Sequence, residues 1–561
     1  MTVWPAFDNT ANRCCFSSKP AWSEPRAIMR GVSEEFIRDT ASEHRSRSHY
    51  PIDRLQTLKS RVCEVTLDPR TPVLVGQGQI SQHEDDLSVV LGPTQLMAQA
   101  VHAAIADAGV TALGTIDALH VLRSLSNREP NPGRSIAREL ALDVRVTGLT
   151  PHGGNLPQSL VNYSALAISR GEIDMVILTG GEASRSRRRA KQSEVQPQWM
   201  NASPESSTDE APTAVGDELV MNHEAELALK IALPIQIYPM FETALRAAAQ
   251  RSVHDHQQLI SELWSRFSKV AEGNRNAWLH KSYTPEQIRT ASPTNRMVGF
   301  PYTKLMNSNN DVDMSAALVL CSVERATALG IARDKWVFPQ AGTDCHEHNF
   351  ISHRWSFTDT PAIRLGGEQL QTLTGKHASE YDFIDLYSCF PSAVQLGAQS
   401  LGLSLNQQLT STGGLSFAGG PFNNYVMNAI ATTMLKVREQ PDTHGFVWAN
   451  GGYATKHAFG AYATTPPKNG FAHSSPQNEV DALPKRQVAS AVEAVGPAKL
   501  EAYSVMHGRD GNPETICASV ILPDSRRAWA TSNDSQLASE MCEREWVGVP
   551  VRLDDSGTLL A

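Results

Sequence analysis

A thiol and two imidazoles lie within four consecutive residues in the run CHEH, from Cys345 to His348. Thiolate and imidazole groups are ligands that zinc prefers, so this run is a candidate metal site. Side chains crowded into four loop residues cannot make a closed tetrahedral shell by themselves, however. We therefore predict no metal site in this protein.

A second candidate is the basic run RSRRRAK, from Arg185 to Lys191, which follows a Gly-Gly-Glu turn. Guanidinium groups bind phosphate through two parallel hydrogen bonds, so this run could contact the phosphates of a ligand. The alternative is an ordinary solvated loop. The sequence leaves both interpretations open.

The spacing of the cysteines indicates whether they are reduced or form disulfides. All eight are scattered, and none forms a CxxC pair or a zinc-finger pattern. Cys14 and Cys15 are adjacent and cannot easily share a structural bridge. This usage indicates reduced thiols in a cytosolic protein rather than a disulfide framework.

Composition excludes several classes of protein. The net charge of -9 over 561 residues argues against a nucleic-acid surface, which needs concentrated basic patches. No stretch approaches the roughly 20 apolar residues that span a bilayer, and the N-terminus lacks the apolar run of a signal peptide. We expect a globular, cytoplasmic protein of two or more domains that binds neither nucleic acid nor membrane.

The elements that must position any site begin at residue 71, where TPVLVGQGQI predicts a buried strand. GPTQLMAQAVHAAIADAGV then predicts a helix that Gly109 ends. IDALHVL, LVNYSALAISRGE and IDMVILTGGEAS continue the alternation of strand and helix, which favours an α/β fold with a parallel sheet. The same order recurs from KWVFPQAG to THGFVWANGGYATKHAFGAY, so we infer an internal duplication.

Six segments follow from these patterns. The C-terminal one alternates short strands with turn signals and is interpreted as a small, separate, barrel-like β domain. The segments are an N-terminal extension (1–70), a first half (71–191), an inserted loop domain (192–305), the remainder of the first half with the second half (306–467), a linker (468–495) and the C-terminal domain (496–561).

Five motifs resemble the thiolase superfamily in sequence and in order, and together they cover residues 71–467. They are ISRGEIDMVILTGGEAS, VDMSAALVL, DLYSCFPSAVQLGAQSLGL, TGGLSFAGGPFNNYV and ANGGYATKHAFG. With the extra C-terminal domain, the set is most similar to the thiolase-like proteins of type 1, or acetyl-CoA acetyltransferase-like proteins. The resemblance implies two βαβαβαββ halves in a five-layer αβαβα sandwich.

The chain departs from the family at its catalytic positions. The nucleophilic cysteine of the family corresponds to Gly154 or Asn155, and Gly420 stands where the family has the histidine of its GHP motif. The NEAF or HDCF element corresponds to YSCF, which supplies Tyr387 and Cys389.

The last family motif, CxG, is replaced at Asn450 to Gly452, and His457 follows it. From these matches we hypothesise that Cys389 is a nucleophile or acid/base thiol paired with His457. Hydrogen bonds to a bound carbonyl are expected from the remaining motif residues, namely Tyr387, Asn423, Asn424, Asn450 and Gly452.

Each assignment has a structural alternative. Cys389 could be a core thiol without chemistry, and Asn423 and Asn424 could satisfy backbone groups of an irregular loop. His152 could replace the missing histidine or be an ordinary loop residue.

Two functions follow from the resemblance: an acyl-CoA-dependent acyltransferase with a non-standard site, or a binding protein for CoA thioesters with little or no activity. In both, the CoA thioester is substrate or ligand and no cofactor is permanently bound. The family implies a homodimer, which the extra domain could prevent, and that domain could itself bind a protein partner.

Overall fold

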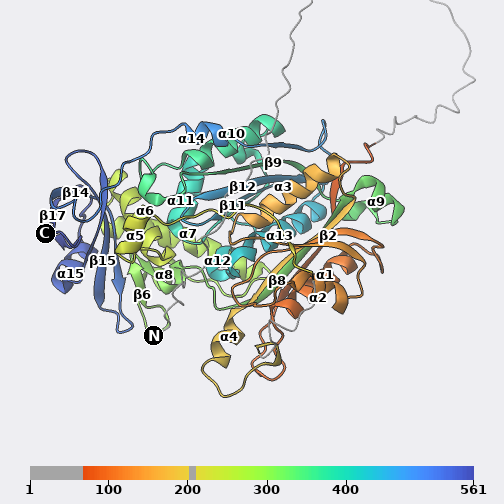
Figure 1. Ribbon diagram of the computed structural model, residues 1–561, viewed down its shortest axis with the longest axis horizontal. Helices are drawn as coiled ribbons and strands as arrows, with labels where there is room; N and C mark the ends of the chain where they lie inside the picture. Colours follow the sequence, from red (N-terminus) through yellow and green to blue (C-terminus); the bar gives the residue numbers. More distant parts are fainter. Residues whose placement is uncertain (1–66, 201–209) are drawn as a thin grey trace, which may run out of the picture. The chain divides into compact units, whose positions relative to one another are not determined.

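The computed structural model describes residues 67–200 and 210–561 (Figure 1). Nearly all of the expected N-terminal extension, up to residue 66, lies outside the described residues. From residue 72 onward the chain alternates strands and helices, as the sequence predicts.

The first sheet has six strands. Its neighbours in space are, in order, β1 (Pro72–Ser81), β8 (Asp313–Ser322), β4 (Met175–Ala183), β2 (Ile116–Val121), β3 (Val144–Leu149) and β5 (Thr213–Ala214). β8 is antiparallel to both β1 and β4, while β4, β2, β3 and β5 are parallel. β4 and β8 are buried along their whole length, which explains their continuous apolar runs.

The second sheet repeats this plan. Its strands follow the order β10 (Phe383–Leu386), β11 (His444–Gly451), β12 (Lys456–Ala463), β9 (Phe338–His346) and β13 (Ala472–Ser474). The path β9-β12-β11-β10 matches β1-β8-β4-β2 in the first sheet, both in chain order and in strand direction. The internal duplication predicted from the sequence is thus confirmed.

Helices complete five layers around the two sheets. α3 (Leu156–Ser169) and α13 (Tyr425–Glu439) lie between the sheets and contact strands of both. The outer faces carry α1 (Pro93–Asp107) and α2 (Pro132–Glu139) on one side and α10 (Pro361–Thr374) and α11 (Pro391–Ser400) on the other (Figure 1). This is the αβαβα sandwich that the resemblance implies.

Local signals explain where the helices begin and end. Proline occupies the first turn of α1, α2, α3, α10 and α11, where its missing N–H costs nothing. α1 ends just before Gly109, whose φ of +75° suits glycine. Shorter helices connect these elements: α4 (Ser184–Ala190), α9 (Val323–Ala328) and α12 (Gly414–Phe417).

The inserted region is mainly helical. It contains α5 (Glu224–Ala228), α6 (Pro234–Ala248), α7 (Val253–Gly273), α8 (Pro285–Arg289) and the short strands β6 (Met297–Phe300) and β7 (Tyr302–Thr303). α6 packs against α11 of the second half and against the C-terminal strands, so it links the two.

The C-terminal sheet follows the path β16 (Arg527–Ser532), β15 (Pro513–Ile521), β14 (Gly496–His507), β17 (Pro550–Leu553) and β18 (Leu559–Leu560), with α15 (Ser535–Glu543) beside it. A bridge between Thr531 and Thr558 brings the two ends of this path together, which gives it a barrel-like closure.

The C-terminal strands are less separate than the sequence predicted, because β6 of the inserted region pairs with β14. A four-residue strand about 200 positions earlier in the chain gives no sequence signal of that pairing. The stretch expected as a linker also contains β13 and α14 (Gln477–Asp481), and β13 joins the second sheet. Three residues are too few to show a strand period.

No helix in residues 67–200 and 210–561 combines the length and apolar character that crossing a bilayer requires.

The attachment of the C-terminal strands to α6 depends on Arg246, which is almost wholly buried. Its guanidinium donates to Glu545 at 3.0 Å and to the Tyr503 hydroxyl at 2.7 Å. We predict that Arg246→Ala lowers the free energy of unfolding by roughly 2–4 kcal/mol, because it leaves buried partners unpaired. Urea unfolding measures this value.

The matched control is Arg526→Ala, which removes an exposed arginine paired with Glu493 and Asp524 in the same region. Its free energy of unfolding should stay close to that of the unaltered protein. Equal losses in both variants would show that the contact between α6 and the C-terminal strands adds little stability.

Candidate active site

Three of the motif segments meet at the start of α3. A Cβ atom built on Gly154 would lie 2.6 Å from the Tyr387 hydroxyl oxygen and 2.5 Å from the Asn450 carbonyl oxygen. Real Cβ contacts are longer than this, so only glycine fits here without movement of its neighbours. Gly154 is one of the two positions that the resemblance matches to the nucleophile, and the space beside it is filled by Tyr387.

Tyr387 presents a protonated hydroxyl at this point. The residue is buried, and burial together with the nearby Cys389 raises the pKa of its phenol above the usual range. Its ring meets that of Tyr425 edge-on, with centroids 5.6 Å apart. Within the described part of the chain, no hydrogen bond engages the Tyr387 hydroxyl. It is therefore a donor without an acceptor.

Cys389 lies just before α11, in a fully buried position. Burial raises the pKa of its thiol to about 12, even though the Tyr238 hydroxyl and the Phe390 backbone N–H favour the thiolate. A thiol with that pKa is almost wholly protonated near pH 7 and is a poor nucleophile. Cys389 therefore lies at the start of a helix, as the hypothesis of a reactive thiol expects. Its pKa is raised, however, whereas that hypothesis requires a lowered one.

His457 lies on β12, with Asn450 and Cys345 as its neighbours in register. Its Nδ1 accepts a 3.4 Å hydrogen bond from the indole of Trp448, and its Nε2 has no partner. Burial lowers the pKa of His457 well below the usual value, so the ring is neutral. In the described residues no hydrogen bond joins His457 to Cys389; each has other partners.

Tyr238, from α6, connects the parts of the site and was missed by the sequence analysis. Its hydroxyl accepts from the side-chain amide of Asn450 at 3.0 Å and from the Ala454 backbone at 2.9 Å, and it donates to the Gly452 carbonyl at 2.9 Å. Asn450 and Gly452, both expected to bind substrate, are thus held by a residue of the inserted region. No family motif marks it.

The two asparagines expected to bind a carbonyl both contact backbone groups. Asn423 accepts from the Gly153 backbone N–H at 3.0 Å and donates to the Arg123 carbonyl at 2.7 Å, and its amide lies 3.1 Å from Nδ1 of His152. Asn424 donates to the Gly180 carbonyl at 2.7 Å, while its side-chain oxygen has no partner among the described residues. These contacts organise the loops around α3.

The site also contains Lys456, which sequence reasoning did not select. Its ammonium donates to the His152 carbonyl at 2.7 Å beside the start of α3. Burial lowers the pKa of Lys456 to about 8, an effect that Glu218 partly offsets. A lysine inside the buried strand KHAFGAYA was the only signal in the sequence. His152 is also desolvated, and burial lowers its pKa.

The remaining sequence candidates have partners within the chain. Arg185 pairs with Asp85 at 2.5 Å and Arg188 with Asp311 at 2.6 Å, so the basic run is tied to acidic neighbours. Cys345 contacts the Ala362 carbonyl from within β9. Across the described residues no group of three or more metal-ligating side chains is assembled.

Comparisons with known proteins bear on the family and the fold. A family model described as "Thiolase-like protein type 1 additional C-terminal domain" matches residues 476–558. The chain resembles the crystal structure of a monomeric SCP2-thiolase like protein type 1 from Mycobacterium smegmatis, with 29% identity and a TM-score of 0.75. That match covers 88% of this chain and 100% of the other.

A more distant structural match is an Ltp2-ChsH2(DUF35) aldolase, with 19% identity and a TM-score of 0.53, covering 70% of this chain and 98% of the other. This second likeness concerns the fold alone. No curated protein sequence matches the chain.

The close contacts beside Gly154 predict the effect of a substitution on stability. Gly154→Ala should lower the free energy of unfolding by about 1–3 kcal/mol, because the added methyl group meets Tyr387 and the backbone of Asn450. Gly273→Ala is the control, since nothing lies within 4 Å of a Cβ at the end of α7. If urea unfolding gives the same value for both variants, the space beside Gly154 is not filled.

Proposed function

We propose that this chain is a thiolase-like protein of type 1 with the additional C-terminal domain, which its C-terminal family match and its 29%-identical structural relative support. We further propose that it binds acyl-CoA thioesters at the start of α3. In this proposal the Tyr387 hydroxyl donates a hydrogen bond to the thioester carbonyl. No acyl-cysteine forms. The observation that carries the proposal is the unpartnered Tyr387 hydroxyl beside Gly154.

The position of that hydroxyl supports a carbonyl as its acceptor. Tyr387 is 8% exposed, and its hydroxyl is not one of the buried polar atoms that lack a partner, so this unbonded donor faces accessible space. In this proposal the ligand oxygen occupies that space and accepts from the hydroxyl. Burial keeps the phenol protonated by raising its pKa, which suits a donor rather than a base. A neutral donor stabilises negative charge that develops on a carbonyl oxygen.

The start of α3 supplies a second favourable feature. A 14-residue helix has the positive end of its dipole at its N-terminus. The Leu156 and Gln158 N–H groups already bond to the Gly153 and Asn155 carbonyls, so the favourable feature is the dipole. Gly154 precedes this helix and carries no side chain of its own. Tyr387 and the helix N-terminus would therefore act on the same oxygen.

A covalent mechanism has less support. Gly154 has no nucleophile, and the space for a histidine at Gly420 is limited, because a Cβ there would lie 2.9 Å from the Asn310 side-chain oxygen. The Cys389 thiol is protonated near pH 7, and His457 is bonded to Trp448. The residues that would make and break an acyl-enzyme are absent or engaged elsewhere.

Acyl transfer through Cys389 is the second candidate. One observation favours it: the thiol lies at the start of α11, within hydrogen-bonding reach of Tyr238 and of the Phe390 N–H. These contacts would help a thiolate if a bound substrate changed the desolvation of the site.

For the oligomeric state we propose a monomer. The Mycobacterium smegmatis relative is described as monomeric. In this chain β5 pairs with the end of β3, from Gly148 to Leu149, so part of the outermost long strand of the first sheet is already covered. A covered edge is a poor template for another chain.

Mass spectrometry separates the two candidates. The purified protein is exposed briefly to acetyl-CoA or acetoacetyl-CoA, quenched in acid and mapped by peptide, while calorimetry measures CoA-thioester binding. We expect binding without a covalent adduct, because no activated thiol is present.

Cys389→Ala is the matched control and should bind the thioesters as the unaltered protein does. An acyl group on Cys389 that disappears in the variant would contradict the proposal and establish a relocated nucleophile. Absence of any binding would contradict both candidates.

A further inference from the structure

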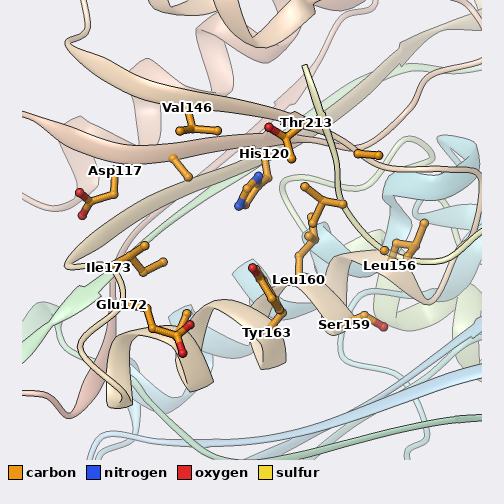
Figure 2. A pocket seen from close by; sticks show the side chains of 15 residues that line it. Asp117, His120, Val146, Leu156, Ser159, Leu160, Tyr163, Glu172, Ile173 and Thr213 are labelled. Atoms are coloured by element: carbon orange, nitrogen blue, oxygen red, sulfur yellow. The ribbon is translucent and has the colours of Figure 1, made fainter. Parts of the chain in front are cut away.

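A hollow of about 530 Å³ lies between the inner face of the first sheet and the flank of α3. Figure 2 shows its lining side chains, which come from β2 and β3 above and from α3 below. The segment around β5 closes another side through Thr213 to Gly216. This volume is in the range of small-molecule pockets in proteins.

One polar side chain in the hollow is both buried and without a partner. His120, on β2, is only 6% exposed, and its Nδ1 makes no hydrogen bond. Figure 2 shows its imidazole pointing from the strand into the hollow, toward Tyr163. The two rings meet edge-on with centroids 6.5 Å apart.

The chain makes room for this imidazole. Gly148, on the neighbouring strand β3, lies against the ring, and a Cβ there would be 2.2 Å from Nδ1 of His120. A larger residue would push the imidazole out of its place. The ring is therefore held at the wall of the hollow by backbone rather than by a hydrogen-bonding side chain.

Apolar surface dominates the rest of the lining. Val146 is 44% exposed and Tyr163 is 57% exposed, values that are high for large hydrophobic residues next to a core. Leu160 and Ile173 lie beside them in the same hollow (Figure 2). Burying this surface against an apolar molecule would be favourable.

Among the described residues, no lysine or arginine lines the hollow. Of its fifteen lining residues, Asp117 and Glu172 are the charged ones, and both are carboxylates. Asp117 is bonded to Arg145 at 2.7 Å, and Glu172 lies 3.9 Å from Arg170, so each is already paired. An anion such as a fatty acid would lose its hydration here without gaining an unpaired cation, and a neutral molecule would not.

We propose that this hollow is a second binding site, which takes a small neutral apolar molecule carrying one hydroxyl group. The hydroxyl bonds to Nε2 of His120, since Nδ1 packs against Gly148, and the apolar body covers Val146, Leu160 and Ile173. Burial lowers the pKa of His120 to about 4, so at neutral pH the ring is uncharged, and Nε2 bonds a hydroxyl as donor or as acceptor according to the tautomer. The site goes beyond the proposed thioester function and does not depend on it.

The test is calorimetric titration of the full-length protein with 1-octanol and, separately, with octanoate. We expect saturable binding of 1-octanol and binding of octanoate at least about tenfold weaker, because the hollow offers the carboxylate no unpaired cation. His120→Phe should weaken 1-octanol binding about fivefold through loss of one hydrogen bond.

Val146→Trp fills the hollow from an exposed position and should abolish 1-octanol binding. Ile173→Trp is a second filling variant, and circular dichroism confirms that each variant is folded. Val492→Trp is the matched control, because Val492 is 72% exposed in another part of the chain and should not affect binding.

Added CoA should leave 1-octanol binding unchanged, which separates this site from the thioester site. The proposal is overturned if 1-octanol does not bind saturably or if filled variants still bind it. Octanoate binding as tight as that of 1-octanol would overturn the assignment of a neutral ligand. An affinity for 1-octanol that is the same in His120→Phe as in the unaltered protein would overturn the hydrogen bond between the ligand's hydroxyl and His120.

Discussion

The contact between Gly154 and Tyr387 limits the chemistry that the candidate site can perform. At the start of α3 the chain has no side chain, and a phenol hydroxyl fills the space. A nucleophile could not be added there without displacing the phenol or the backbone of β11. The same packing that excludes a thiol at this position brings the protonated Tyr387 hydroxyl to the helix N-terminus. One contact therefore excludes a nucleophile and supplies a hydrogen-bond donor.

A chain of contacts supports this arrangement from the C-terminal strands inward. Arg246 and Thr243 of α6 bond to Tyr503 of β14, and Tyr238, nearer the start of the same helix, bonds to Asn450. α6 thus connects the C-terminal sheet to the turn that faces Gly154. On this account the additional domain holds α6 in place, and α6 holds the site.

The sequence predicted the elements whose signals are local. β1, α1, α3 and β4 show clear apolar patterns with proline and glycine at their ends, and the repeated order revealed the duplication. The motifs also singled out Tyr387 and Cys389 as candidate site residues. The motifs could not show the surroundings of these side chains in the folded protein. The pKa of Cys389 depends on burial among residues distant in sequence. The partners of Asn423 and Asn424 are backbone groups of other loops.

Two features had no sequence signal. Tyr238 reaches the site from about 200 residues away, inside a helix whose pattern predicts only packing. β6 pairs with β14 through two residue pairs, which are too few to leave a period. Both depend on tertiary contacts that one sequence does not encode in any local pattern.

The most direct measurement of the central claim is isotope-edited infrared spectroscopy of acetyl-CoA labelled with carbon-13 at its carbonyl. The account predicts that the bound carbonyl stretch lies at lower wavenumber than that of the free thioester, because a hydrogen bond weakens the C=O bond, and that Tyr387→Phe removes most of this shift while binding persists. A bound carbonyl at the same wavenumber in both proteins would contradict the role of Tyr387.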